Sequence, residues 1–333
     1  MFYLFAALSF SRLSCKNGAN KNVDWFSTFK IPAINDRNPN HATGLAFFYI
    51  DETTRLMESN GDMGSKNNNP VYYSMAPMYT STSKVGYVLI SDQPPEGTTP
   101  ASRAHMKGVM IFDEDNGIYI EHSTPKFPPD PNSDDYSYPS TGTKYGQSLL
   151  CVTLSHSGLE SVAQGLLIDR PGVYASSLPV YTKDIIPSLS SVISQDWNRE
   201  DETMQRTIQV GSVSFEFFAK SGSWNQDLYH DLLAPSLKAR SFSQTWSNGV
   251  GTLTSDCTGK YSSFNVLKMT FDGVEWPRSK DHSKWAVIGD YVCISGINRQ
   301  ASQFKRGGGA WCKKDATWAR SMTRVVGEYE QCP

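Results

Sequence analysis

The chain has 333 residues, enough for one large globular unit or two ordinary domains. Its 39% hydrophobic, 12% aromatic and 19% charged content excludes a disordered chain, because disordered segments are polar and poor in aromatic residues. The formal net charge of −2 means that bulk electrostatics alone would not hold the protein on a polyanion at neutral pH. Protonation of all six histidines would change this charge to +4, which favours an encounter with a polyanion at acidic pH.

The start of the chain carries an apolar cluster, Phe2 to Phe10, that resembles the hydrophobic region of a secretory signal. Ser14 is a small residue suited to precede a cleavage point, so we expect residues 1–14 to be a signal peptide. Two alternatives would explain the same apolar cluster: a wrongly assigned start of the protein sequence, or an N-terminal strand that is buried in the fold. No run approaches the roughly 20 apolar residues that a membrane helix needs, so no membrane anchor is expected.

The six cysteines form an even set without a CxxC pair and without histidines at metal-ligand spacing. This pattern favours three disulfides in an oxidising compartment over a zinc site or redox chemistry. Six buried free thiols in a cytosolic protein are the alternative. Spacing alone leaves fifteen possible pairings open.

The first half of the chain is predicted to be rich in strands. Residues 44–52 and 84–92 are apolar, aromatic runs bounded by Asn, Gly and Pro, as is typical of strands, and residues 60–70 and 92–100 have loop composition. Residues 105–123 are predicted to form a hairpin that turns at Asn116-Gly117, and the prolines of 126–140 exclude a helix or a central strand.

Helices and strands alternate in the remainder. We expect a helix at 155–167 that Ser155 caps, a strand at 208–220, and a helix at 225–239 that Pro235 interrupts. The junction between the two halves is expected within about 160–205.

The most informative feature of the sequence is a short internal repeat. His105-x-Lys107, followed by five mostly apolar residues and Asp113, is matched 177 residues later by His282-x-Lys284 and Asp290. A His and a Lys two positions apart project from one face of a strand. The repeat therefore predicts a two-lobed active site, against the alternative of two unrelated, solvated strand ends.

Two such pairs suit the cleavage of a phosphodiester. A neutral imidazole can attack phosphorus, a protonated imidazole can give its proton to the leaving oxygen, and two lysines can offset charge on the non-bridging oxygens. No metal is required. Because an unperturbed histidine has a pKa of about 6.5, one charged and one neutral imidazole coexist at mildly acidic pH.

His122 lies in the return arm of the predicted hairpin. A turn at Asn116-Gly117 pairs His122 with Ile111, on the sheet face of Lys107 but about 13 Å further along the strand. A longer loop would be needed to bring it to the site. Its counterpart in the second copy lies near Asn298, and a purely structural, hydrogen-bonded histidine is the alternative for His122.

Other candidate features carry less information. The lone histidines His41, His156 and His230 are expected at the surface or in packing roles. Residues 113–117 do not fit a calcium loop and are expected to form a turn. Arg306 and the three glycines after it could contact a phosphate or form a plain loop.

The chain resembles the deoxyribonuclease II family, the acid endonucleases whose fold is related to the phospholipase D superfamily. The likeness keeps its order along nearly the whole chain, in the segments 23–26, 30–33, 92–95, 105–108 (HMKG), 121–129 (EHSTPKFPP), 145–152, 217–229, 281–285 (DHSKW), 296–299 (GINR) and 306–312 (RGGGAWC).

The resemblance implies an α/β fold of two phospholipase D-like lobes, residues 15–170 and 171–333, each a mixed β-sheet flanked by helices and related by a pseudo-twofold axis. The repeat itself adds Asn298, Asp113 and Asp290 as residues expected to support the site or bind the substrate phosphate. The resemblance implies that the catalytic residues are His105, Lys107, His282 and Lys284, and that His122 is also required. It also implies the disulfides Cys15–Cys151, Cys257–Cys332 and Cys293–Cys312.

The activity implied is cleavage of double-stranded DNA to 3′-phosphate ends without metal or other cofactor, in the lysosome or outside the cell. His105 is favoured as nucleophile and His282 as general acid, although the reverse assignment is open. A DNA-binding protein or toxin that has lost turnover, or a lipid phosphodiesterase, are the alternatives. No obligate protein partner is expected.

Overall fold

The computed structural model describes residues 13–36, 38–81, 84–197 and 202–333. Most of the expected signal peptide, residues 1–12, therefore lies outside the described residues. Its last two residues are buried, and the Leu13 carbonyl accepts a hydrogen bond from Asn116 Nδ2 at 2.5 Å. Among the described residues, no helix has the length and apolar character needed to cross a bilayer.

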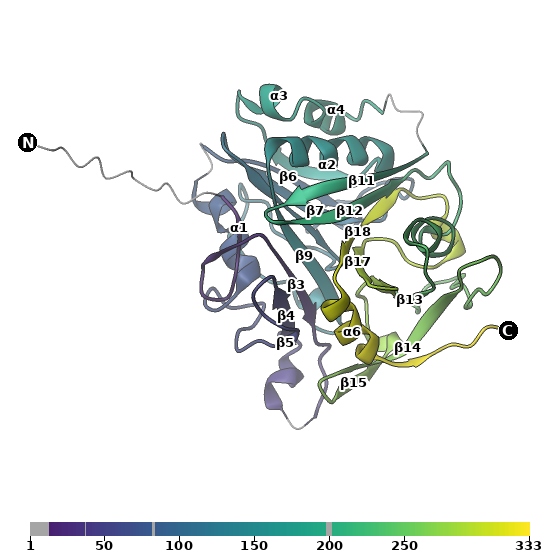
Figure 1. The fold of residues 1–333 in the computed structure, drawn as a ribbon. Helices are drawn as coiled ribbons and strands as arrows, with labels where there is room; N and C mark the ends of the chain where they lie inside the picture. The colour runs from purple at the N-terminus through teal and green to yellow at the C-terminus, as the bar shows by residue number, and fades with distance from the viewer. Residues whose placement is uncertain (1–12, 37, 82–83, 198–201) are drawn as a thin grey trace, which may run out of the picture.

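The fold is mixed α/β, as expected, and is built on two large β-sheets (Figure 1). In the described chain the first sheet has the order β10-β6-β7-β8-β9-β3-β4-β5. Its strands are β3 (Trp25–Lys30), β4 (Phe47–Asp51), β5 (Met57–Glu58), β6 (Gly86–Ser91), β7 (Lys107–Phe112), β8 (Gly117–His122), β9 (Gln147–Leu154) and β10 (Val173–Ser177).

The second sheet has the order β11-β12-β18-β17-β16-β13-β14-β15, and β19 also pairs with β14. Its strands are β11 (Thr203–Val210), β12 (Val213–Lys220), β13 (Ser241–Gln244), β14 (Ser263–Phe271), β15 (Val274–Pro277), β16 (Trp285–Ile288), β17 (Tyr291–Ser295), β18 (Gly308–Lys314) and β19 (Val326–Tyr329). A small hairpin joins β1 (Cys15–Lys16) to β2 (Asn22–Val23).

The strand directions differ from the mixed sheets that the resemblance implies. Every strand pair of the first sheet is antiparallel. The second sheet contains one parallel pair, β13 with β14, whose long connection over residues 245–262 permits the crossover that parallel pairing needs. Residues 208–220, expected as one strand, form the end of β11 and all of β12, because Gly211 turns the chain with a φ of 57°.

Helices pack against the outer faces of the two sheets and against the core that lies between them. They are α1 (Pro70–Thr80), α2 (His156–Asp169), α3 (Thr182–Ile185), α4 (Leu189–Ser194), the π-helical η3 (Leu228–Leu233), α5 (Ala234–Leu237) and α6 (Ala316–Val325), with short 3-10 turns at Pro39–Thr43, Ser140–Gly142, Arg278–Lys280 and Ala301–Gln303. Ser155 caps α2 as predicted, and accepts a hydrogen bond from Gly158 N.

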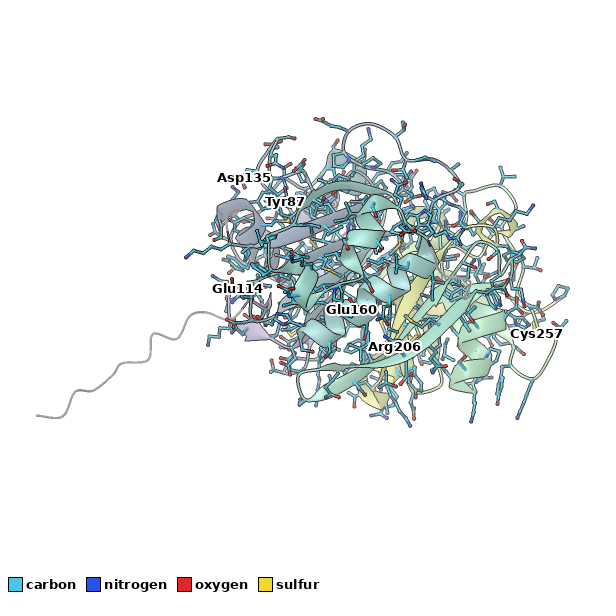
Figure 2. All side chains as sticks on the ribbon, turned by 90° about the horizontal axis from the view of Figure 1, so that it is seen from above. Tyr87, Glu114, Asp135, Glu160, Arg206 and Cys257 are labelled. Atoms are coloured by element: carbon cyan, nitrogen blue, oxygen red, sulfur yellow. A yellow bond between two sulfur atoms is a disulfide. The ribbon has the colours of Figure 1, made fainter. Side chains whose placement is uncertain are left out.

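The expected boundary between lobes at residue 170 does not follow the sheets. Strand β10 lies beyond it and pairs with β6, so residues 173–177 belong to the first sheet. The chain passes to the second sheet between Ser177 and Thr203. Over this connection α3 and α4 pack against α2, where Glu160 accepts hydrogen bonds from Ser188, while Arg206 of β11 donates one to Gln164 (Figure 2).

The two sheets share one hydrophobic core. The inner faces of both contribute to it, and Trp25 of β3 stacks on Trp318 of α6 with ring centroids 5.0 Å apart. Separate cores lie between α1 and the outer face of the first sheet, and between η3 and the second. The halves therefore cannot part without exposing large aromatic side chains to water.

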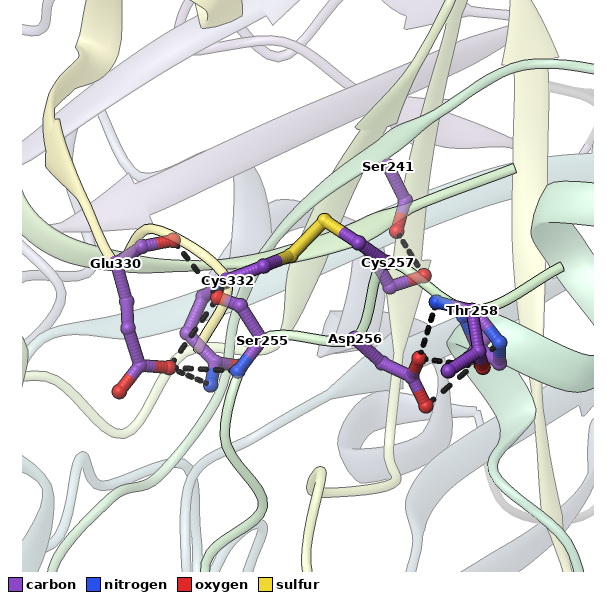
Figure 3. The surroundings of a disulfide bond; sticks show 10 residues. Ser241, Ser255, Asp256, Cys257, Thr258, Glu330 and Cys332 are labelled. Atoms are coloured by element: carbon purple, nitrogen blue, oxygen red, sulfur yellow. Dashed lines mark hydrogen bonds and ion pairs between the residues drawn. A yellow bond between two sulfur atoms is a disulfide. The ribbon is translucent and has the colours of Figure 1, made fainter. Parts of the chain in front are cut away.

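The three disulfides of the structure are those that the resemblance implies: Cys15–Cys151, Cys257–Cys332 and Cys293–Cys312. The second of them ties the last residues of the chain to the segment before β14 (Figure 3). Beside it, Glu330 accepts hydrogen bonds from the backbone N–H of Ser255 at 2.7 Å and from Asn265 Nδ2 at 2.8 Å. The C-terminal segment is thus held by covalent and polar contacts together.

Candidate active site

The first H-x-K pair lies where the chain enters β7. His105 precedes the strand and Lys107 is its first residue, and both are buried. His105 is held by the second half of the chain: its N–H donates to Gly307 O at 2.9 Å, and its Nδ1 lies 2.6 Å from Gly296 O. Gly296 directly follows β17 and has no room for a side chain, since a Cβ there would lie 2.9 Å from the His105 carbonyl oxygen.

The second H-x-K pair lies where the chain enters β16. Here the roles of the two halves are exchanged, since residues of the first half hold His282. The His282 N–H donates to Gly146 O at 2.8 Å, and its Nδ1 lies 2.9 Å from Ser123 O and 3.2 Å from Gln147 Oε1. Ser123 directly follows β8. Each histidine is therefore fixed by a backbone carbonyl that follows a strand of the other half, and the two pairs meet at the interface of the sheets.

The lysines of the two pairs have different surroundings. Lys107 Nζ donates to Asp92 Oδ1 at 2.6 Å, and Arg306 Nη2 lies 3.3 Å from Asp92 Oδ2. Lys284 Nζ donates to the backbone carbonyl of His282 at 2.8 Å. Burial, together with the charge of Lys107, holds the pKa of Lys284 well below its usual value. An arriving anion would favour the charged form of Lys284.

Burial also keeps both histidines neutral. It lowers the pKa of His105 to about 3, although the nearby Asp92 acts in the opposite direction. It lowers the pKa of His282 well below its usual value, and the charges of Lys284 and Lys107 lower it further. For Asp92, burial opposes ionisation, but the positive charges beside it, that of Lys107 foremost and that of Arg306 as well, outweigh burial and hold the carboxyl pKa well below its usual range.

His122 lies opposite Lys107, and the predicted hairpin register is wrong. The pairing runs from Gly108 with Glu121 to Phe112 with Gly117, so the turn is the four-residue segment 113–116 and not Asn116-Gly117 alone. Asp113 makes this longer turn, since its Oδ1 accepts hydrogen bonds from the N–H groups of Asp115 and Asn116. This is the longer loop that His122 needs in order to reach the site.

The surroundings of His122 contain no hydrogen-bond partner among the described residues. Neither ring nitrogen has one, although the side chain is buried, and the ring packs edge-on against Phe127 with centroids 5.5 Å apart. Burial and the charge of Lys107 lower its pKa to about 3. Continued register across β16 and β17 makes Ser295 its counterpart, since Ser295 N donates to Lys284 O, and not the expected Asn298.

Asn298 and Arg306 both reach the first pair. Asn298 Nδ2 lies 3.4 Å from His105 Nε2, and its Oδ1 accepts a hydrogen bond from Trp246 N, which fixes the orientation of the amide. Arg306 also donates to the backbone carbonyls of Arg103 and Ala104. The segment of Arg306 and the glycines is therefore part of the site.

Two expected supporting residues do not lie at the site. Asp113 and Asp290 occupy the turns at the far ends of the hairpins β7–β8 and β16–β17. Asp113 lies six positions along the chain from Lys107, about 20 Å at the usual rise of a strand. The acidic residue that does meet Lys107 is Asp92, which directly follows β6, the neighbouring strand.

The lone histidines have structural surroundings, as expected. His41 is buried between Asp36 and Glu58, at 2.6 and 2.8 Å. His230 lies 3.7 Å from Asp256, and His156 is the first residue of α2.

Sequence reasoning missed Asp92, Gln147 and Trp246. Asp92 is expected where a strand gives way to a loop, and it begins the segment 92–95 of the family resemblance, but neither observation predicts a role at the site. Gln147 and Trp246 have no motif of their own, and they reach His282 only because β9 and β13 end beside it.

Comparison with known proteins identifies the family. The family model described as deoxyribonuclease II matches residues 14–332. Plancitoxin-1 of Acanthaster planci is 34% identical over 96% of this chain and 92% of its own length. Deoxyribonuclease-2-alpha of Mus musculus is 30% identical over 96% and 94%, and cell death-related nuclease 6 of Caenorhabditis elegans is 29% identical over 98% and 91%. The chain belongs to the deoxyribonuclease II family and is a DNA nuclease, a hydrolase.

Proposed function

We propose that the protein is an acid endonuclease that cleaves DNA phosphodiesters to 3′-phosphate ends, with His105 as nucleophile and His282 as general acid. The observation that carries the proposal is the reciprocal hold on the two imidazoles, His105 by Gly296 O and His282 by Ser123 O. The proposal includes an approximate twofold relation between the hairpins β7–β8 and β16–β17, which would place the two rings on opposite sides of one phosphate.

The carbonyl contacts determine which ring nitrogen reacts. A carbonyl oxygen only accepts hydrogen bonds, so Nδ1 of each histidine carries a proton and Nε2 of the neutral ring carries a lone pair. In the first step, His105 Nε2 forms a bond to phosphorus as the bond from phosphorus to O5′ breaks. His282 Nε2, protonated in the substrate complex, gives its proton to that oxygen. Water then attacks the phosphohistidine, giving its proton to His282 and releasing the 3′-phosphate.

The charges around His105 support its role as the nucleophile. Attack by Nε2 leaves a positive charge on the ring, and Asp92 Oδ2 lies 3.7 Å from that nitrogen. The Asn298 amide, oriented by Trp246 N, points its N–H group at Nε2 and so favours the lone pair there. The lysines Lys107 and Lys284 would offset the charge that gathers on the non-bridging oxygens. The proposed mechanism therefore requires no divalent cation.

The surroundings of His282 support its role as the acid. A histidine with a lowered pKa is a strong proton donor once it is charged, and the phosphodiester anion would favour its charged form. Because the pKa is lowered, the protonated fraction grows as the pH falls toward it. Activity is therefore expected to rise from neutral to acidic pH.

The test is to incubate purified protein with supercoiled plasmid at about pH 5 in excess EDTA, and to map the ends of the products. We expect nicking and then degradation to 3′-phosphate ends, with no cutting by His105→Ala. Intact plasmid would contradict the proposal. Plasmid that is bound equally by both proteins and never cut would instead support a DNA-binding protein without turnover.

We also propose that the protein works in the secretory pathway, in the lysosome or outside the cell. The three disulfides support this location, because such bonds form and persist in oxidising compartments. Expression of a tagged full-length chain in animal cells tests it. Protein found in acidic vesicles or in the medium would support the proposal, and cytosolic protein with free thiols would contradict it.

A further inference from the structure

A partly exposed aromatic pair borders the second histidine. Trp246 follows β13 and Tyr145 precedes β9, so the two rings come from different halves of the chain. Their centroids are 4.8 Å apart at an interplanar angle of 79°, and the Trp246 ring meets His282 at 5.1 Å and 70°. The three rings therefore form a continuous row that begins at His282.

Trp246 is fixed relative to both histidines. Its N–H donates to Asn298 Oδ1 at 3.3 Å, and its carbonyl accepts from Gln300 Nε2 at 3.0 Å. Asn298 in turn lies 3.4 Å from His105 Nε2. These bonds hold the backbone of Trp246 beside the proposed site of phosphoryl transfer, and the rings of Tyr145 and His282 contact its indole. The residue is only partly buried, so part of it stays exposed.

The outer end of the row carries positive charge. Lys144 is exposed, and its Nζ lies 5.2 Å from the centroid of the Tyr145 ring. Aromatic rings on which bases stack, next to cations that follow the backbone, are the elements by which proteins bind single-stranded nucleic acid. The row offers both within one continuous surface next to His282.

We propose that Trp246 and Tyr145 form a stacking site for the base of the nucleotide that carries the leaving oxygen, with Lys144 beside the next phosphate. The inference rests on the proposed function, in which His282 gives its proton to O5′ of that nucleotide. A base that stacks on these rings has left its neighbours in the duplex. The site therefore takes bases from single strands or from locally opened duplex.

The experiment uses a labelled single-stranded oligonucleotide in which one residue is replaced by tetrahydrofuran, which keeps the backbone and lacks the base. The cut rate is measured at the linkage on the 5′ side of that residue, at about pH 5 in EDTA. In the wild type we expect this linkage to be cut about tenfold more slowly than the same linkage in the unmodified strand, which corresponds to about 1.4 kcal/mol.

The variant Trp246→Ala separates stacking from a structural role. We expect it to cut the unmodified linkage about tenfold more slowly than the wild type does, with no further loss at the baseless residue. Trp246→Phe should retain part of the discrimination, and Tyr145→Leu should reduce it. A loss that is equal for both substrates, with the discrimination intact, would show a structural role and overturn the proposal.

The chain offers a matched control in Lys260 and Tyr261. These residues repeat the Lys-Tyr sequence, and Lys260 Nζ lies 5.3 Å from the Tyr261 ring centroid. Tyr261→Leu should keep the wild-type rates and the wild-type discrimination. No discrimination in the wild type, or discrimination only at the linkage on the 3′ side, would overturn the stacking site. A wild type that cuts neither strand would instead contradict the proposed function.

Discussion

The two H-x-K pockets hold their histidines through the same kind of backbone hydrogen bond, but different side chains surround the two imidazole rings. Each histidine precedes a strand, and its Nδ1–H donates a hydrogen bond to a backbone carbonyl of the other half. Around the first pair lie the charged groups Asp92 and Arg306. Around the second lie the amide of Gln147 and the indole of Trp246. A shared frame with different surroundings allows two imidazoles to take different roles.

The difference indicates how the roles are divided. Asp92 can stabilise a cation that forms on His105, as attack on phosphorus would produce. His282 holds a proton weakly, because burial and two lysines lower its pKa. A nucleophile needs the first environment and a proton donor benefits from the second. Substitutions that disable one pocket, or that make it resemble the other, test this division of roles.

The largest effect is expected from replacing the histidines. His105→Asn should lower kcat on plasmid DNA by at least about 10⁴-fold, and His282→Asn by about 10² to 10⁴-fold. A thymidine 3′-(4-nitrophenyl phosphate) substrate tells the roles apart, because nitrophenolate leaves without a proton. Absorbance at acidic and then alkaline pH follows its release.

On that substrate His282→Asn should recover most of the wild-type rate of the first step, seen as a burst of nitrophenol equal to the amount of enzyme, because only the later attack of water still uses His282. His105→Asn should stay inactive. The nitrophenyl group replaces only the leaving nucleoside, so both variants keep the same contacts to the thymidine. Recovery by His105→Asn in place of His282→Asn would reverse the assignment. Recovery by neither variant would contradict the division of roles.

Asp92→Asn removes the charge that distinguishes the first pocket. We expect kcat/KM to fall about 10 to 100-fold and the free energy of unfolding to fall by about 3 kcal/mol, because Lys107 and Arg306 lose a buried partner. The folded-state pKa of Asp92 is depressed, so its stabilisation is complete above the unfolded value of about 3.9 and is lost as the pH falls through the folded value.

Urea unfolding from pH 3 to pH 7 measures this difference in stability. The gap between wild type and Asp92→Asn should be constant above about pH 5 and should shrink below about pH 4. Asp315→Asn is the matched control, since Asp315 also pairs with a lysine, Lys313, at 2.7 Å. It should leave kcat/KM unchanged. A gap that grows as the pH falls would contradict the assigned pKa shift.

The substitution His122→Ser gives the hairpin β7–β8 the side chain that the hairpin β16–β17 has at the equivalent position, Ser295. The buried ring nitrogens of His122 lack partners among the described residues, so we expect them to bond to substrate or to water at the site. Loss of one such bond should lower kcat/KM about tenfold, with partial recovery in His122→Asn. Unchanged kcat/KM in a stably folded His122→Ser would show that the residue only fills space.

The predictable parts of the structure were those that local sequence determines. The alternation of residues 105–123 predicted a hairpin, Ser155 predicted the start of α2, and the H-x-K repeat predicted two equivalent strand ends. The disulfide pairs followed only from the family resemblance, because spacing left fifteen pairings equal. Local patterns thus identified the elements, and family likeness supplied long-range pairs.

The remaining features depend on contacts that sequence spacing does not encode. Asn116-Gly117 is a strong two-residue turn signal, yet the side chain of Asp113 stabilises a longer turn. The register therefore places His122 opposite Lys107 instead of Ile111. The surroundings of His282 come from β9 and β13, which are distant in sequence. Only the packing of both sheets on one core brings them together.

The smallest effect is expected from giving the second pocket a carboxylate, as the first has. Gln147 Oε1 lies 3.2 Å from His282 Nδ1, so Gln147→Glu places a negative charge beside that ring. An opposite charge favours the protonated imidazole and raises its pKa. Because activity requires protonated His282, the pH range over which activity declines toward neutral should move about one pH unit higher, as measured by initial rates on plasmid.

The variant Gln209→Glu is the control, since it adds the same charge at an exposed position of β11 and should leave the pH–rate profile in place. A profile that moves toward acid, or that does not move while the protein stays folded, would mean that the proton held by His282 is not the one delivered to the leaving oxygen.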